Sequence, residues 1–324
     1  MQSNFDRVYF LGDSLSDTGN FLNLSRLGGE PFPVEPYKPG RFSNGNVWTD
    51  NFIEEFDLDI DLATSPTFSS DGLNFAIGGG TSGDSNVARD ENGNPLPGFY
   101  GLEQQVDILE PLLNVNNALG QSASDDLFFI WIGANDYFSY IQDDPTTPDV
   151  IETNFPRRGA ETRNAVIEVV DINIKGAIHD IVDAGGEDIV VFNLPDLDKT
   201  PLAGELEKKD QRKLKKLTKL HNKRLSNVVD DIEDSNPDVN IIEVDANNLF
   251  DDILDNPGEF GLTNVTDNFT GIDIVTRINE PGAGEGANVN EYLFFDSIHP
   301  TATVHGFVSD LVVAELVNEG LITA

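Results

Sequence analysis

The sequence predicts a three-layer α/β/α sandwich around a central parallel sheet. Short runs of β-branched and aromatic residues alternate along the chain with longer segments of helical periodicity. The runs at 127–132 and 188–194 are apolar almost throughout, as expected of strands that are buried on both faces. No Pro-, Gly- or Ser-rich linker divides the 324 residues, which predicts a single domain over residues 1–324.

Individual elements follow from the same patterns. We expect strands where apolar and β-branched runs end in turn signals, at 7–11, 73–77, 127–132, 188–194, 240–245 and 291–295. Apolar residues three and four positions apart predict helices at 46–56, 102–113, 162–184, 208–232 and 303–319.

Composition narrows the range of partners. With 57 acidic and 20 basic residues, the formal charge of −37 argues against nucleic acid or an anionic membrane surface as a general partner. No apolar run approaches the roughly 20 residues of a membrane span, so we expect no stable membrane insertion. The chain has no cysteine, which excludes disulfides and thiolate metal sites. Its first residues lack the charged-then-apolar pattern of a signal peptide.

One segment departs from the acidic composition. Nine of the 20 basic residues lie between Lys208 and Arg224, where apolar residues recur at helical spacing. We therefore expect one amphipathic helix with a basic outer face. Its charge has two interpretations, a solvated face or a docking stripe for anions or lipid head groups.

Ser14 is the first candidate for chemistry. The strand predicted at 7–11 ends abruptly at Gly12-Asp13-Ser14, and in open α/β folds ligands bind where strands end. A serine nucleophile needs a base, a group that orients the base, and donors for an oxyanion.

Only four histidines are available as the base. His179 and His221 lie inside predicted helices and His305 lies two turns into the last one, so we expect structural roles for these three. His299 instead follows Asp296 by three residues in a short irregular loop. A tight turn of that length can return the carboxylate to Nδ1 and leave Nε2 for the serine. Asp13, although adjacent to Ser14, is expected to shape the turn.

Three groups are candidate oxyanion donors. They are the backbone N–H of Ser14, the N–H of a glycine in Gly78-Gly79-Gly80, and the side-chain amide of Asn135. All three lie just past strand ends on the same predicted edge of the sheet.

Other motifs are absent or incomplete, so we expect no cofactor and no metal. Gly78 to Gly83 matches G-x-G-x-x-G, but no predicted helix follows to receive a pyrophosphate. The chain contains neither a P-loop nor G-x-S-x-G. The acidic run 57–61 lacks the glycine of a calcium loop and is expected to be an exposed segment.

Four blocks of sequence together resemble the GDSL, or SGNH, family of esterases and lipases, in the family's order. They are Gly12-Asp13-Ser14-Leu15-Ser16-Asp17-Thr18-Gly19-Asn20, Asn74-Phe75-Ala76-Ile77-Gly78-Gly79, Gly133-Ala134-Asn135-Asp136 and Asp296-Ser297-Ile298-His299-Pro300. The likeness is closer to the branch of secreted bacterial lipases and plant esterases, from Asp17 to Asn20, Asn256-Pro257 and Gly261.

The resemblance implies a flavodoxin-like sandwich, the SGNH hydrolase fold, with Ser14 as nucleophile, His299 as base and Asp296 as its partner. It also implies an oxyanion hole made by Ser14, Gly79 and Asn135, with Gly78 as an alternative to Gly79. Secretion or a cell-surface location is implied as well.

The sequence thus predicts a serine ester hydrolase that acts through an acyl-enzyme on a small-molecule or lipid carboxylic ester. Acyl transfer to a lipid or sugar alcohol is an alternative within enzymes, and a non-catalytic binding module on the same fold is an alternative outside them. Loops 28–46, 84–101 and 143–159 are expected to wall the site. Their candidate acyl contacts, with those next to Asn135, are Phe32, Tyr37, Phe99, Tyr100, Tyr137, Phe138 and Phe155.

Overall fold

A six-stranded sheet forms the centre of the computed structural model, which describes residues 2–65, 71–89, 95–142, 160–274 and 286–323. All its strands are parallel, which confirms the predicted sheet. In spatial order they are β3 (Asp61–Leu62), β4 (Gly72–Asn74), β2 (Val8–Gly12), β5 (Leu127–Trp131), β6 (Asp188–Phe192) and β7 (Asn240–Val244). The single domain over residues 1–324 stays a prediction.

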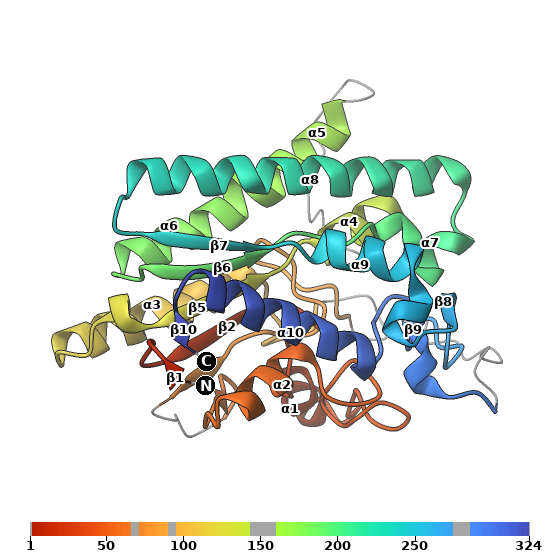
Figure 1. The fold of residues 1–324 in the computed structure, drawn as a ribbon, viewed down its shortest axis with the longest axis horizontal. Coiled ribbons are helices and arrows are strands. Elements are labelled where there is room, and N and C mark those ends of the chain that lie inside the picture. The colour runs from red at the N-terminus through yellow and green to blue at the C-terminus, as the bar shows by residue number, and fades with distance from the viewer. Residues whose placement is uncertain (1, 66–70, 90–94, 143–159, 275–285, 324) are drawn as a thin grey trace.

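Helices cover both faces of this sheet, so the predicted three-layer α/β/α architecture is confirmed (Figure 1). One layer contains α3 (Leu102–Ala118), α5 (Ala160–Val166), the π-helical η2 (Ile167–Ile174), α6 (Lys175–Asp183) and α8 (Lys208–Ser235). The opposite layer contains α2 (Trp48–Glu55) and α10 (Ala302–Asn318), which pack against each other. The helix predicted at 162–184 is the continuous run α5, η2 and α6.

Two pairs of short strands lie outside the main sheet. β1 (Gln2–Ser3) pairs antiparallel with β10 (Ile322–Thr323), which brings the two ends of the described chain together. β8 (Asn264–Asn268) pairs in parallel with β9 (Tyr292–Phe294). The strand predicted at 291–295 therefore exists but does not join the central sheet.

Several helices were not predicted from the sequence. They are α1 (Asn20–Leu27), α4 (Ala134–Gln142), α7 (Pro201–Glu205) and α9 (Ala246–Asp255), with the 3₁₀ turns η1 (Ala123–Asp125), η3 (Leu197–Lys199), η4 (Pro257–Phe260) and η5 (Val289–Glu291). Helix α4 begins three residues after β5 ends, so the sequence of its first turn resembles that of a loop that follows a strand. These helices matter because α4 and α9 line the site described below.

Strand β2 marks the point where the direction of winding changes. The chain places β3 and β4 on one side of β2 and β5, β6 and β7 on the other. In open α/β sheets the crevice at the carboxyl end of such a strand is the usual ligand site. Ser14 follows the end of β2 by two residues, as the sequence predicts.

Candidate active site

The turn that presents Ser14 depends on a glycine at the end of β2. Gly12 has φ of +148°, and a Cβ there would lie 2.3 Å from the backbone oxygen of Trp131 on the neighbouring strand β5. Gln105 of α3 completes the strand end, because its side chain accepts from the Gly12 N–H at 2.7 Å and donates to the Gly12 C=O at 2.8 Å. Any larger residue at position 12 would displace the two central strands.

Asp13 shapes the turn, as expected from the sequence. Its side-chain Oδ1 accepts the N–H of Leu15 at 3.0 Å, and its carbonyl accepts the N–H groups of Ser16 and Asp17. Burial raises the pKa of Asp13 to about 7. One oxygen of the carboxyl group beside Ser14 is thus bound to the turn, and no hydrogen bond in the described structure joins Asp13 to His299.

Ser14, His299 and Asp296 form a connected chain of hydrogen bonds. Ser14 Oγ lies 2.8 Å from His299 Nε2, and His299 Nδ1 lies 2.7 Å from Asp296 Oδ2. The other oxygen, Asp296 Oδ1, accepts the backbone N–H groups of Ile298 and His299 at 2.9 and 2.8 Å. All three side chains are buried. The structure therefore brings together residues 285 positions apart in the order serine hydroxyl, imidazole and carboxylate.

Tyr37 is a fourth member of this hydrogen-bond network, although the sequence predicted a different role for it. Its hydroxyl donates to Asp296 Oδ2 at 2.8 Å, the same oxygen that faces His299. The ring of Phe42, from the same loop, lies 5.1 Å from the His299 ring. The sequence offered Tyr37 as an acyl contact, and no spacing or motif points to a residue 259 positions away.

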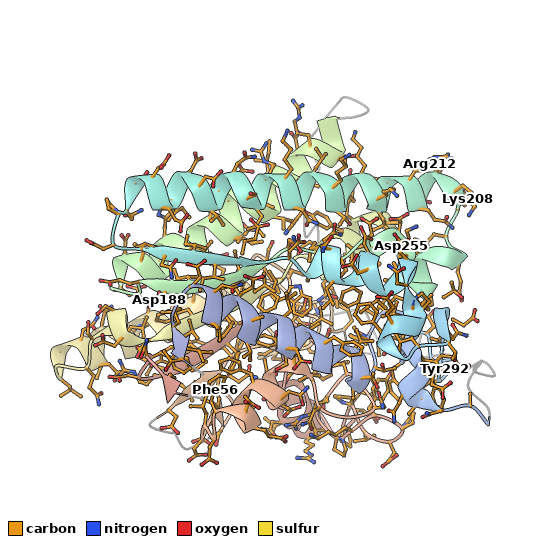
Figure 2. The ribbon with its side chains drawn as sticks, in the orientation of Figure 1. Phe56, Asp188, Lys208, Arg212, Asp255 and Tyr292 are labelled. Atoms are coloured by element: carbon orange, nitrogen blue, oxygen red, sulfur yellow. The ribbon has the colours of Figure 1, made fainter. Side chains whose placement is uncertain are left out.

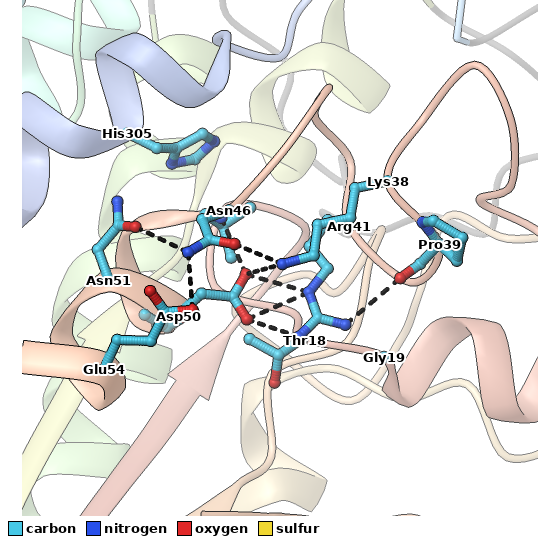
Figure 3. A network of polar contacts seen from close by, with 12 residues as sticks. Thr18, Gly19, Lys38, Pro39, Arg41, Asn46, Asp50, Asn51, Glu54 and His305 are labelled. Atoms are coloured by element: carbon cyan, nitrogen blue, oxygen red, sulfur yellow. Dashed lines mark hydrogen bonds and ion pairs between the residues drawn. The ribbon is translucent and has the colours of Figure 1, made fainter. Parts of the chain in front are cut away.

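The loop that carries Tyr37 is fastened to α2 by charged groups. Figure 3 shows Arg41 and Lys38 converging on Asp50, with Arg41 Nε 3.0 Å from Asp50 Oδ2 and Lys38 Nζ 3.8 Å from the same oxygen. Lys38 also bonds the side chain of Asn46. The Ser43 hydroxyl donates to the carbonyl of Pro300 at 2.8 Å. The loop that carries Tyr37 is therefore also joined to the loop that carries His299.

Two of the backbone N–H groups that the sequence predicts as oxyanion donors are unengaged in the described structure. Those of Ser14 and Gly79 donate no hydrogen bond within the part of the chain that the structure describes. In contrast, the N–H of Gly78 is donated to Asp17 Oδ2 at 2.9 Å. Gly79 has φ of +76°, and a Cβ there would lie 2.8 Å from Asn86 Oδ1, so glycine is required. The geometry favours Gly79 over Gly78.

Asn135, in the first turn of α4, faces the same region. Its Nδ2 donates to the carbonyl of Gly80 at 2.9 Å and, over a longer 3.3 Å, to Asp13 Oδ2. The bond to Gly80 fixes the amide plane, and the longer bond to Asp13 is the weaker of the two. Asn135 thus links the residue before Ser14 to the residue after Gly79.

The other histidines occupy the structural positions expected for them. His221 is buried on α8 and its Nδ1 lies 2.9 Å from the hydroxyl of Tyr137. His305 is buried on α10 and its Nδ1 accepts the backbone N–H of Trp48 at 3.3 Å. Burial lowers the pKa of both His221 and His305 to about 3, so both rings are neutral. His179 is half-buried on α6.

An apolar pocket opens beside Ser14 and His299. The side chains and backbone that line it are Asp13, Ser14, Leu15, Ala134, Asn135, Phe138, Leu194, Pro195, Asp196, Leu197, Lys199, Thr200, Phe250, Leu254, Phe294, Ile298, His299 and Pro300. Most of its far wall comes from the segment after β6 and from α9, neither of which was predicted to line the site.

The structure places the predicted acyl contacts in different surroundings. Phe138 lines the pocket. Phe32, Phe99 and Tyr100 instead belong to a separate apolar cluster built on Phe21, Phe42 and Ile77, so they support loop packing. Loop 143–159, with Phe155, lies outside the described residues. Within the described ranges, no cluster of three or more His, Asp or Glu side chains is arranged to hold a metal ion.

Comparison with known proteins gives consistent results. The family described as GDSL-like lipase/acylhydrolase matches residues 8–312. A phosphatidylcholine-sterol acyltransferase of Aeromonas hydrophila is 25% identical, covering 94% of this chain and 88% of the relative. Acetylajmalan esterase 2 of Rauvolfia serpentina is 25% identical over 97% of this chain and 91% of its own length. A secreted effector protein of Salmonella typhimurium is 28% identical over 92% of this chain and 60% of its own length.

Proposed function

The chain belongs to the GDSL-like lipase/acylhydrolase family, and from the geometry of its site we propose that Ser14, His299 and Asp296 are the catalytic triad of an ester hydrolase. Membership of this family makes the chain a carboxylic ester hydrolase, and the proposal assigns the reaction to particular side chains. The observation that carries it is the unbroken chain of hydrogen bonds from Ser14 Oγ to Asp296, at 2.8 and 2.7 Å.

In the first half of the reaction, Ser14 Oγ attacks the ester carbonyl carbon while His299 Nε2 takes the hydroxyl proton. Asp296 holds the imidazole by Nδ1 and stabilises the positive charge that forms on it. Collapse of the tetrahedral intermediate breaks the bond to the leaving alcohol, which receives its proton from His299. The product of this half is an acyl-enzyme ester at Ser14.

In the second half, a water molecule loses its proton to His299 and attacks the acyl-enzyme. The carboxylic acid leaves, and the proton returns to Ser14. In both halves the oxyanion is stabilised by the N–H groups of Ser14 and Gly79 and by the Asn135 amide. Support for Gly79 is that its N–H is unengaged in the described structure, whereas Asp17 occupies the N–H of Gly78.

The substrate is a small-molecule or lipid ester, with its acyl chain in the apolar pocket. Support comes from the apolar side chains that line the pocket, among them Leu15, Phe138, Phe250 and Leu254. Within the described residues, no helix is both long and apolar enough to cross a membrane. Because one relative is a secreted effector, we propose that this chain also works outside the cytoplasm.

Acyl transfer is a second candidate because one relative is an acyltransferase that matches 94% of this chain. An alcohol in place of water would then attack the acyl-enzyme at Ser14, with His299 as its base. Hydrolysis and acyl transfer are separated by analysing the products of p-nitrophenyl butyrate turnover with and without added glycerol or cholesterol. Butyrate as the main product in both cases assigns hydrolysis, and an ester of the added alcohol as the main product assigns transfer.

The test of the nucleophile is Ser14→Ala assayed on p-nitrophenyl acetate and butyrate. We expect turnover to fall by about 10⁴-fold or more, because removal of the attacking group leaves only binding and the oxyanion hole. Ser235→Ala, at an exposed position near the end of α8, is the matched control and should retain full activity. Hydrolysis by pure Ser14→Ala at the rate of Ser235→Ala would reject the proposed nucleophile.

A further inference from the structure

The outer face of α8 is the strongest concentration of positive charge in the described chain. Its exposed basic side chains are Lys208, Lys209, Arg212, Lys215, Lys216, Lys219 and Lys223. The face that packs on the sheet is apolar, with Leu214, Leu217 and Leu225 buried. The amphipathic helix expected from the sequence is therefore confirmed.

The position of these charges along α8 opposes the stability of the helix. A helix dipole favours acidic residues in the first turn and basic residues in the last. Here Lys208 and Lys209 stand in the first turn beside Asp210, and Glu233 and Asp234 stand in the last turn with no basic residue. Helix stability alone thus does not account for the distribution.

Spacing adds a second unfavourable effect. Like charges four positions apart on a helix repel each other. Five pairs of basic residues have this spacing, namely Lys208 and Arg212, Lys209 and Lys213, Arg212 and Lys216, Lys215 and Lys219, and Lys219 and Lys223. Lys216, Lys219 and Lys223, at the centre of the outer face, form no ion pair within the part of the chain that the structure describes.

The basic half of α8 lies at the end of the molecule that carries the pocket. Figure 2 shows Lys208 and Arg212 at the same end as Asp255 of α9, with Asp188 at the other end. Lys215 Nζ is 3.9 Å from Asp196, which lines the pocket. On the other flank, Lys213 Nζ lies 3.8 Å above the ring of Tyr140 on α4, the helix that contributes Phe138 to the pocket.

We propose that the outer face of α8 docks the protein electrostatically on an anionic lipid surface. This inference rests on the proposed ester hydrolysis for its choice of partner. An anionic lipid interface supplies both the negative charge that complements α8 and the acyl esters that suit the apolar pocket beside it. The remaining acidic surface does not prevent docking, because charges more than about 8 Å from the lipid are screened at physiological salt.

Vesicle sedimentation tests the proposal in the Ser14→Ala background, where the lipid is not consumed. At physiological salt we expect the protein to bind phosphatidylglycerol vesicles and to bind phosphatidylcholine vesicles far more weakly. We expect it to dissociate as salt rises further. The triple variant Lys216→Gln, Lys219→Gln and Lys223→Gln should bind about a hundredfold more weakly, at about fivefold for each lost charge.

A matched control removes three positive charges from outside α8, among them Lys175, whose Nζ lies 4.0 Å from Asp231 at the acidic end of α8. The control variant carries Arg26→Gln, Arg163→Gln and Lys175→Gln, on α1, α5 and α6. It changes the formal charge by as much as the α8 variant does, so it should bind vesicles like the parent. With Ser14 intact, both triple variants should hydrolyse p-nitrophenyl butyrate at the wild-type rate. This readout separates failure of docking from failure of the catalytic proposal.

Three outcomes would overturn the inference. The first is equal vesicle binding by the two triple variants, or no binding by the parent. The second is loss of thermal stability confined to the α8 variant, which would assign its lysines to attraction within the folded chain. The third is that the α8 variant abolishes a different interaction, either concentration-dependent self-association or binding of DNA without binding of vesicles. Either result would assign the face to another partner.

Discussion

Hydrogen bonds hold the edge of the sheet around Ser14, whereas apolar contacts hold the far wall of the pocket. At the edge, the Asp296 carboxylate alone engages His299, Tyr37 and two backbone N–H groups. The wall is formed by side chains such as Phe250 and Leu254 of α9, which fix a shape rather than a direction. Under the proposed mechanism, the edge therefore sets the rate of the reaction and the wall sets which esters react.

Asn135→Ala breaks the edge while leaving Ser14, His299 and Asp296 in place. We expect kcat to fall by about 10²–10³-fold, because one preorganised oxyanion donor is lost, with little change in KM. The loss should be the same for acetate and octanoate esters, since the wall is untouched. Steady-state kinetics on both p-nitrophenyl esters check this. A loss confined to one chain length would assign Asn135 to the wall.

This difference explains how much was predictable from the sequence. Ser14, Asn135 and the Asp296–His299 turn are polar residues at strand ends, where their chemistry requires particular residue types at particular spacings. The parallel sheet was predictable for a similar reason, because continuous apolar runs such as 127–132 indicate burial on both faces. The order of the strands needed the structure.

The wall left no comparable signal. Apolar residues of α9 such as Phe250 satisfy any core-facing helix, and nothing in their spacing says that they face a ligand. Tyr37 was missed as a partner of Asp296 because no motif in its loop marks it for that contact. Its loop was expected to form a wall and instead bonds Asp296 and Pro300 through Tyr37 and Ser43.

A second way to probe the edge uses pH. Burial raises the pKa of Asp13 to about 7, above the roughly 3.9 of an unfolded aspartate. Between those values the folded chain holds a proton that the unfolded chain has released, so the contribution of Asp13 to stability falls as pH rises from about 4 to 7.

Asp13→Asn should remove that dependence, since its amide stays neutral. Urea unfolding at pH 5 and pH 8 measures the effect, and we expect the drop in unfolding free energy to be smaller in the variant by about 2 kcal/mol. An equal drop in wild type and variant would show that Asp13 is ionised throughout this range.

Tyr37→Phe breaks the edge more gently. Removing the hydroxyl deletes one hydrogen bond to the Asp296 carboxylate, so the imidazole is held less firmly, and we expect kcat to fall about tenfold with KM nearly unchanged. Kinetics on acetate and octanoate esters should show the same factor. Tyr137→Phe is the matched control, because it also loses a buried hydroxyl, one that is bonded to His221 and not to Asp296. Equal losses in both tyrosine variants would contradict the assigned role.

The smallest expected effect comes from changing the wall. Leu254→Phe adds volume on the α9 side of the pocket and should lower kcat/KM for octanoate several-fold while leaving acetate unchanged. Rates across esters of two to sixteen carbons measure the change in preference. A uniform loss at all chain lengths would mean that the wall and the edge are not separable.

The central claim, that Ser14 forms the acyl-enzyme, is tested most directly by labelling with a fluorophosphonate and mapping the adduct by mass spectrometry. We predict one adduct per chain, located on Ser14, with ester hydrolysis lost in proportion to labelling. Ser14→Ala should remain unlabelled, and urea-unfolded protein should lose the reaction. An adduct on another residue, or full hydrolysis after stoichiometric labelling of Ser14, would contradict the account.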